Sequence, residues 1–261
     1  MDLKNLNILG GMDLESFRFE GAQSEMIVIA IVDGYRDYIE HRKDRHKKMI
    51  ISSAFAWTKG NFIESKIAET CSDLNFSYKK AKAGLTWDYL QFIQGNTKKL
   101  FLIKNAAYFN ENSFSQAVLP NKSKSHSPQR TYLHELSRIN KKLKFPSTHQ
   151  NRENISGHSI QLSFKISEEL IKDELNHFKS LYNEFHILTY KIDDTYQISQ
   201  IMHYLPNPDD NIAYRIENLS KYISGAELTD DEREIIAPDP DSDVIDPAAF
   251  DIGIFEDEES K

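Results

Sequence analysis

Three strand-like segments follow one another in residues 75–105, which read NFSYKKAKAGLTWDYLQFIQGNTKKLFLIKN. Residues 87–93 are aromatic and β-branched, as half-buried strands are. Residues 100–103 form a short apolar run, which is typical of a strand buried on both faces. The sequence 94–97 between them, QGNT, favours a turn because Gly and Asn tolerate positive φ. With a further strand at 76–81, the stretch predicts a three-stranded β-meander.

Helices are predicted before and after this meander. Residues 62–71 repeat apolar side chains at helical spacing, and Asn61 with Glu64 forms a capping-box pattern at their start. Residues 128–143 carry an apolar stripe on one face after a Ser-Pro start, so they predict a second helix. A strand-like segment follows at 159–164.

The order helix, three strands, helix, strand over residues 61–165 resembles the core of the restriction-endonuclease-like family. In that family, an acidic residue near the start of the second strand and an acid-x-Lys on the third hold a divalent metal. The resemblance puts Asp88 and Lys104 at these places, with Glu64 on the first helix as a further acid. It implies that Asp88 and Glu64 bind Mg²⁺ and that all three residues are catalytic. In the family an acid stands two residues before this lysine, but this chain has Leu102 there.

Each of these three residues also has a purely structural interpretation. Glu64 is explained equally by the capping box with Asn61. Asp88 fits a surface or turn acid, and Lys104 fits the point at which a strand meets water. The nuclease-like site and the structural interpretation therefore both stand at this point.

The rest of the chain alternates further helix and strand patterns. They predict a helix over 24–48 capped by Ser24, a helix over 168–183, a β-hairpin over 184–205 and a short helix within 212–223. Together with the meander, these segments predict an α+β fold in which helices flank a mixed β-sheet. We expect one main domain, 24–225, after an N-terminal arm, 1–23.

Charge divides the chain sharply. The net charge is −8, but residues 226–261 contain 14 Asp and Glu against 2 Lys and Arg, a net of −12. The remaining 26 acids and 30 bases give residues 1–225 a net of +4. The tail has little to bury, so it is predicted to be an acidic disordered segment on a mildly basic body.

The densest basic stretch is 121–144, with seven Lys and Arg against the single acid Glu135. Phosphate contacts need cations, and aromatic side chains can stack on bases. The candidate nucleic-acid-binding residues are Lys122, Lys124, Arg130, Tyr132, Arg138, Lys141 and Lys142. A solvated basic loop and helix explains the same pattern, and both interpretations also apply to 36–48, where six Lys and Arg stand against three acids.

Cysteine and apolar content exclude several classes of protein. Cys71 is the only cysteine, so intramolecular disulfides and multi-cysteine zinc sites are excluded, and we expect it to be a buried small hydrophobe. No apolar run approaches the roughly 18–20 residues that span a bilayer, so no membrane association is expected. The start lacks a signal-peptide pattern, which predicts a cytoplasmic protein. P-loop, dinucleotide and nucleophile-elbow motifs are absent from the sequence.

Two functions follow as hypotheses. The first is a cytosolic bacterial or phage-related protein that engages DNA or RNA through 121–144, with a degenerate nuclease-like core, in defence or regulation. The second is a regulator, such as an antitoxin or immunity protein, that binds a protein partner through its acidic tail. That tail contains an apolar island, FDIGIF at 250–255, which resembles a docking motif.

Overall fold

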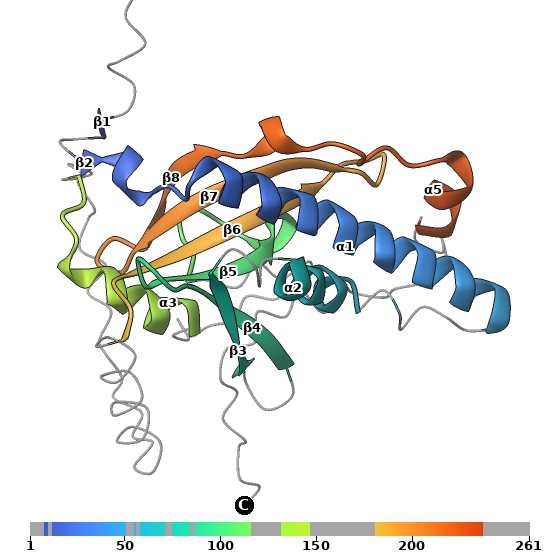
Figure 1. The fold of residues 1–261 in the computed structure, drawn as a ribbon, viewed down its shortest axis with the longest axis horizontal. Helices are drawn as coiled ribbons and strands as arrows, with labels where there is room; N and C mark the ends of the chain where they lie inside the picture. The colour runs from blue at the N-terminus through green and yellow to red at the C-terminus, as the bar shows by residue number, and fades with distance from the viewer. Residues whose placement is uncertain are drawn as a thin grey trace, which may run out of the picture.

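A mixed six-stranded sheet with helices on both faces makes up the protein (Figure 1). The computed structural model describes residues 8–9, 12–50, 55, 58–70, 75–83, 87–115, 132–146 and 181–236. The α+β class and the mixed, helix-flanked sheet are confirmed. None of the helices in these described ranges is long and apolar enough to cross a membrane.

The strands lie side by side in the order of the sequence. They are β3 (Phe76–Ala83), β4 (Trp87–Gln94), β5 (Lys99–Asn105), β6 (Glu184–Ile192), β7 (Ile198–Asn207) and β8 (Ile212–Asn218). Neighbouring strands are antiparallel except for β5 and β6, which are parallel. A small separate pair is formed by β1 (Ile8–Leu9) and β2 (Met12–Asp13).

The predicted meander is present as β3, β4 and β5, and the turn between β4 and β5 is closed by Lys98 N–H donating to the Gln94 carbonyl at 2.8 Å. Lys98 adopts a positive φ of 55° there. Pairing between β4 and β5 covers only 92–94 against 99–101, whereas β3 and β4 pair along their whole length. The first part of β4, up to Gln91, is therefore not paired with β5. We call this separation, between 88–91 of β4 and 102–105 of β5, the fork.

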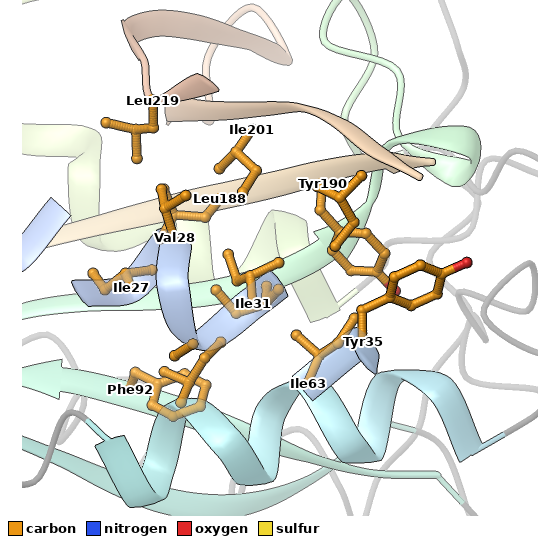
Figure 2. Packing of buried hydrophobic residues seen from close by; sticks show 14 of the residues in the cluster. Ile27, Val28, Ile31, Tyr35, Ile63, Phe92, Leu188, Tyr190, Ile201 and Leu219 are labelled. Carbon is orange, nitrogen blue, oxygen red and sulfur yellow. The ribbon is translucent and has the colours of Figure 1, made fainter. Parts of the chain in front are cut away.

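Two helices cover one face of the sheet. These are α1 (Gly21–Lys48) and α2 (Lys59–Thr70), and Figure 2 shows how Ile31, Ile63 and Leu188 meet from α1, α2 and β6. All three side chains are fully buried, so the sheet and both helices share one core. The helices approach closely at Gly34, where an added Cβ would lie 2.7 Å from Ile63 Cα.

The opposite face carries α3 (Tyr132–Ser137) and the 3₁₀ helix η6 (Arg138–Lys142). Their buried side chains Leu133, Leu136 and Ile139 join a second core with residues of β5, β6 and β7. Three shorter 3₁₀ helices are η2 (Leu14–Phe17), η5 (Ala106–Tyr108) and η7 (Ser220–Tyr222).

The short helix predicted within 212–223 is present only as the 3₁₀ helix η7, and the prediction missed the strand β8, which 212–218 form at the edge of the sheet. Along this strand the buried Ala213 and Ile216 lie on either side of the exposed Arg215. A tight turn at Asn211, with φ of 62°, folds β8 back along β7, so that the two antiparallel strands form backbone hydrogen bonds with each other. Only η7 remains of the predicted helix.

Packed structure extends beyond both predicted limits of the main domain, residues 24 and 225. Leu14 and Phe19, in the predicted arm, are buried. Helix α1 begins at Gly21 rather than at Ser24, and the Gln23 side chain caps the Glu20 N–H. The predicted domain boundaries therefore cut through packed structure at this end.

At the other end, residues 226–236 are folded although the tail is predicted to be disordered. Leu228 is buried, and Arg36 Nη1 donates to the carbonyls of Gly225 and Glu227 at 2.7 and 2.8 Å. Helix α5 (Asp230–Ile236) lies beside the second half of α1 (Figure 1). Residues 237–261, Cys71, the predicted strand 159–164 and nearly all of the predicted helix 168–183 lie outside the described residues.

Candidate functional site

The fork between β4 and β5 is occupied by a side chain from α2. Glu64 Oε2 accepts a hydrogen bond from Leu90 N–H at 2.9 Å, at the place where β4 no longer has β5 beside it. Burial raises the pKa of Glu64 to about 8, although the Leu90 N–H and the charge of Lys104 both act against this rise. This shift favours the neutral, protonated form of the Glu64 carboxyl group. The Glu64 carboxyl group therefore bonds the backbone of β4 and does not cap the start of its own helix, which begins at Lys59.

Lys104 and Tyr132 meet at the end of β5. Lys104 Nζ donates to the Tyr132 hydroxyl at 2.9 Å and lies 5.5 Å from the centre of its ring. The Tyr132 ring in turn packs against Tyr89 of β4, with centroids 5.0 Å apart. Two residues predicted for separate roles, one catalytic and one nucleic-acid-binding, are thus in direct contact through the docking of α3 on the sheet.

The third predicted catalytic residue, Asp88, is exposed and lies opposite Lys82 in the β3–β4 register. Leu102, at the position where the related family has an acid, is buried in the core with 1% exposure. The apolar face of β5 at this point is therefore used for packing.

These residues do not fit a Mg²⁺ ion well. Mg²⁺ requires oxygen ligands in near-octahedral arrangement, usually including carboxylates. Glu64 is engaged by Leu90 N–H, and its raised pKa favours the neutral carboxyl group, which is a weaker cation ligand than a carboxylate. In the described parts of the chain, no three His, Cys, Asp or Glu side chains are grouped to hold a metal ion. We derive no chemical step through a metal, and the predicted magnesium site stays a prediction.

A basic surface begins where α3 ends. We use this name for Arg138, Lys141, Lys142 and Lys144, of which the three lysines are exposed. Arg138 pairs with Glu135 at 3.0 Å, so its charge is partly compensated. The other predicted nucleic-acid-binding residues, Lys122, Lys124 and Arg130, lie outside the described residues.

Asn140 fixes this basic surface to the sheet. Its Nδ2 donates to the carbonyls of Phe185 and Pro206 at 2.7 and 2.9 Å, and its Oδ1 accepts from Phe185 N–H at 2.8 Å. The side chain is fully buried and bridges the start of β6 and the end of β7. The lysines of η6 are therefore presented from a rigidly anchored turn.

A second polar cluster, on the α1 face of the sheet, was not found by sequence reasoning. It runs from Lys99 of β5 through Glu184 and His186 of β6 to His203 of β7. Lys99 Nζ lies 3.4 Å from Glu184 Oε2, which is 3.0 Å from His186 Nε2. His186 Nδ1 is 2.9 Å from His203 Nε2, and both histidines are completely buried.

The spacing in the sequence contains a signal for this cluster. Glu184 and His186 are two residues apart, and side chains at this spacing in a strand share a face of the sheet. The hairpin β6–β7 then brings His203 beside them, because Leu188 pairs with His203. A search for histidines at helical spacing alone misses an arrangement that depends on strand pairing. Comparison of the chain with family models, with curated proteins and with solved structures finds no match.

Proposed function

We propose that this protein binds nucleic acid at the basic surface of η6 and at the neighbouring fork. The observation that carries the proposal is the contact between Lys104 and Tyr132, at 2.9 Å. It joins the first residue of α3 to the end of the central strand β5. Lys104 and the basic surface of η6 therefore belong to the same face of the sheet, the face that carries α3.

The chemistry of these groups suits a phosphodiester backbone. Exposed lysines supply the sequence-independent electrostatic attraction on which nucleic-acid affinity mainly depends. An ammonium group and a phenol hydroxyl are hydrogen-bond donors for phosphate oxygens. Tyr132, which is only partly buried, adds an aromatic side chain of the kind on which unpaired bases stack. We therefore favour single-stranded nucleic acid or a strand end as the ligand.

The order of the elements supports a degenerate nuclease-like core. Among the described residues, helix α2, the meander β3–β5, helix α3 and strand β6 come in the order that the resemblance predicts, although β6 lies later in the chain than the predicted strand 159–164, which is outside the described residues. Glu64 and Lys104 both lie at the fork, and the charge of Lys104 acts on the Glu64 carboxyl. With Leu102 in place of an acid, we propose binding without efficient cleavage.

Binding is tested by fluorescence anisotropy with labelled single-stranded DNA, RNA and duplex DNA at several salt concentrations. The test variant is Lys141→Ala with Lys142→Ala. The matched control is Lys47→Ala with Lys48→Ala, which removes the same charge from exposed residues at the end of α1. We expect the test variant to reduce affinity several-fold and to lower the slope of log affinity against log salt by about 1–2.

Three outcomes contradict the proposal in different ways. Absence of binding to every ligand at low salt removes the function itself. An effect of the α1 control as large as that of the test variant assigns the ligand to 36–48 or to non-specific charge. Unchanged affinity in the test variant, with binding intact, excludes the basic surface of η6.

A further inference from the structure

The segment that precedes α1 contacts the polar cluster formed by Lys99, Glu184, His186 and His203. Residues 14–20, which we call the strap, cross over it. Lys99 Nζ donates to the carbonyls of Ser16 and Arg18 at 3.2 and 3.1 Å. The Phe19 ring stacks on the His203 ring, with centroids 4.7 Å apart and an interplanar angle of 6°. The strap is therefore held by Lys99 and His203, which belong to the polar cluster.

The hydrogen bonds determine how the two imidazoles are protonated. Burial alone would raise the pKa of Glu184, but the hydrogen bond from His186 and the charge of Lys99 lower it overall, so Glu184 is an anion that only accepts. His186 must then carry its proton on Nε2, and its Nδ1 accepts from His203 Nε2–H. This leaves the lone pair of His203 Nδ1 buried, and no partner lies within hydrogen-bonding distance in the described structure.

An extra proton at this site has no favourable position. On His203 Nδ1 it would create a buried cation with no acceptor for its N–H. If the proton moves along the polar cluster to His186, His203 must switch tautomer and again presents an unsatisfied N–H. Burying a charge or donor without a partner is costly, so the closed strap resists protonation.

Both cations and acids lie around the histidine pair. The cations that act on His203 are Lys99 of β5 and Arg18 of the strap. Arg18 also forms an ion pair with Glu15, with Nη1 and Oε1 3.7 Å apart. The acids are Glu184, already bonded to Lys99 and His186, and Glu217, which lies across from His203 on β8. Glu217 in turn pairs with Lys221 at 3.1 Å. Burial first, and then these cations, lower the pKa of His203, while burial also lowers that of His186.

We propose that His186 and His203 form a proton-operated latch, so that acidification releases the strap while the sheet remains folded. Opening the strap hydrates both rings and removes the penalty for charging them. The strap is held by the Lys99 bonds, the Phe19 stack and the burial of Leu14, whereas β6 and β7 are joined by backbone pairing along most of their length. Below the ordinary imidazole pKa of about 6.5, each proton taken up on opening favours the open state about tenfold per pH unit.

The latch is tested by hydrogen exchange of the full chain between about pH 7.5 and 5.5, with rates corrected for the intrinsic effect of pH on exchange. Amides of the strap are compared with those of β6 and β7. We expect protection of the strap to fall about tenfold to a hundredfold per pH unit below 6.5, with little change in the ladder. His203→Gln keeps a donor for His186 Nδ1 without an imidazole, and should reduce this dependence. His41→Gln, on α1, is the matched control and should retain it.

The wild-type protein alone also decides the question if His203→Gln does not fold. A strap whose corrected protection is constant over this pH range overturns the proposal. So does a strap that opens only together with β6 and β7, because that is global acid unfolding. Retention of the full pH dependence in folded His203→Gln excludes His203 as the latch.

Discussion

The Glu64 carboxyl group accepts the N–H of Leu90 at 2.9 Å and so replaces the strand that β4 loses when it leaves β5. A backbone N–H that is buried without a partner is costly. A side chain from α2 therefore makes the fork possible. This role is independent of any ligand, so it separates the structural part of the site from its proposed function.

Glu64→Gln should reduce the dependence of stability on pH. The pKa of Glu64 rises from 4.5 in the unfolded chain to about 8 in the folded protein, so between these values the folded state holds a proton that the unfolded state lacks. The free energy of unfolding should therefore fall with rising pH, by about 1.4 kcal/mol per unit, until pH passes the folded value. Gln also accepts the Leu90 N–H and does not titrate.

Urea unfolding of both proteins between about pH 6.5 and 8 measures this difference, in a range above the ordinary imidazole pKa. Glu69→Gln, at an exposed position of the same helix, is the control and should leave the slope unchanged. Equal slopes in wild type and Glu64→Gln would show that Glu64 is ionised at neutral pH in the folded protein.

Gly34→Ala should destabilise the protein even though alanine favours helices. The new Cβ would lie 2.7 Å from Ile63 Cα and 2.9 Å from the Phe62 carbonyl oxygen, which are backbone atoms of α2. Separating α1 and α2 should cost about 1–3 kcal/mol. Gly60→Ala, where no atom lies within 4 Å of the new Cβ, should be neutral or stabilising by up to about 1 kcal/mol. Thermal unfolding in which Gly34→Ala is the more stable variant would contradict the close packing.

Asn140→Asp should destabilise the protein by about 3 kcal/mol, because the two bonds donated by Nδ2 are lost and two buried carbonyls remain without their donor. Asn112→Asp, at an exposed position, should change stability by less than about 0.5 kcal/mol. Chemical denaturation compares the two. If Asn140→Asp unfolds at the same denaturant concentration as wild type, the η6 anchor is not formed in solution.

Truncation of the acidic tail should affect stability differently when the chain ends at residue 236 and when it ends at residue 225. A chain ending at 236 should keep its stability, whereas one ending at 225 should lose several kcal/mol. The shorter chain loses the buried Leu228, the packed helix α5 and an acceptor of Arg36. Thermal unfolding tests this, and equal melting temperatures for both truncations would show that α5 adds nothing to the fold.

The same truncation at 236 tests whether the tail competes with nucleic acid. Residues 237–261 carry nine acids and one lysine, so their removal should tighten binding at low salt. The difference should shrink as salt rises, because the Debye length is about 8 Å at physiological ionic strength. Affinity that is the same with and without the tail at every salt concentration would exclude competition and favour a protein partner for 250–255.

The meander could be predicted because its signals are local. Gln94 to Thr97 specify a turn, and the apolar run at 100–103 requires burial wherever it is placed. The edge strand β8 could not be predicted in this way, because the pairing of Ala213 with Pro206 decides its conformation. The candidate site shows the same division. The resemblance to the nuclease-like family singles out Lys104, but the contact of Lys104 with Tyr132 depends on how α3 docks on the sheet.

The buried histidines show why tertiary pairing limits such reasoning. His186 and His203 are 17 positions apart, and only the register of β6 with β7 brings their rings together. Glu64 is a similar case, because a capping box is visible in the sequence whereas its bond to Leu90 crosses 26 positions. Residues that act across elements are therefore the ones most easily misassigned from sequence.

The single parallel pairing, between β5 and β6, has a consequence for how the chain folds. It divides the sheet into two antiparallel halves, β3–β5 and β6–β8, each built from neighbouring segments. The seam between them joins Lys99–Asn105 to Glu184–Ile192, and the whole of 106–183 must be looped out before it closes. Loop closure over such a distance is entropically unfavourable and slows folding. During synthesis, the first half must therefore wait with the apolar edge of β5 uncovered until the second half emerges, which makes that edge the segment most exposed to misassembly.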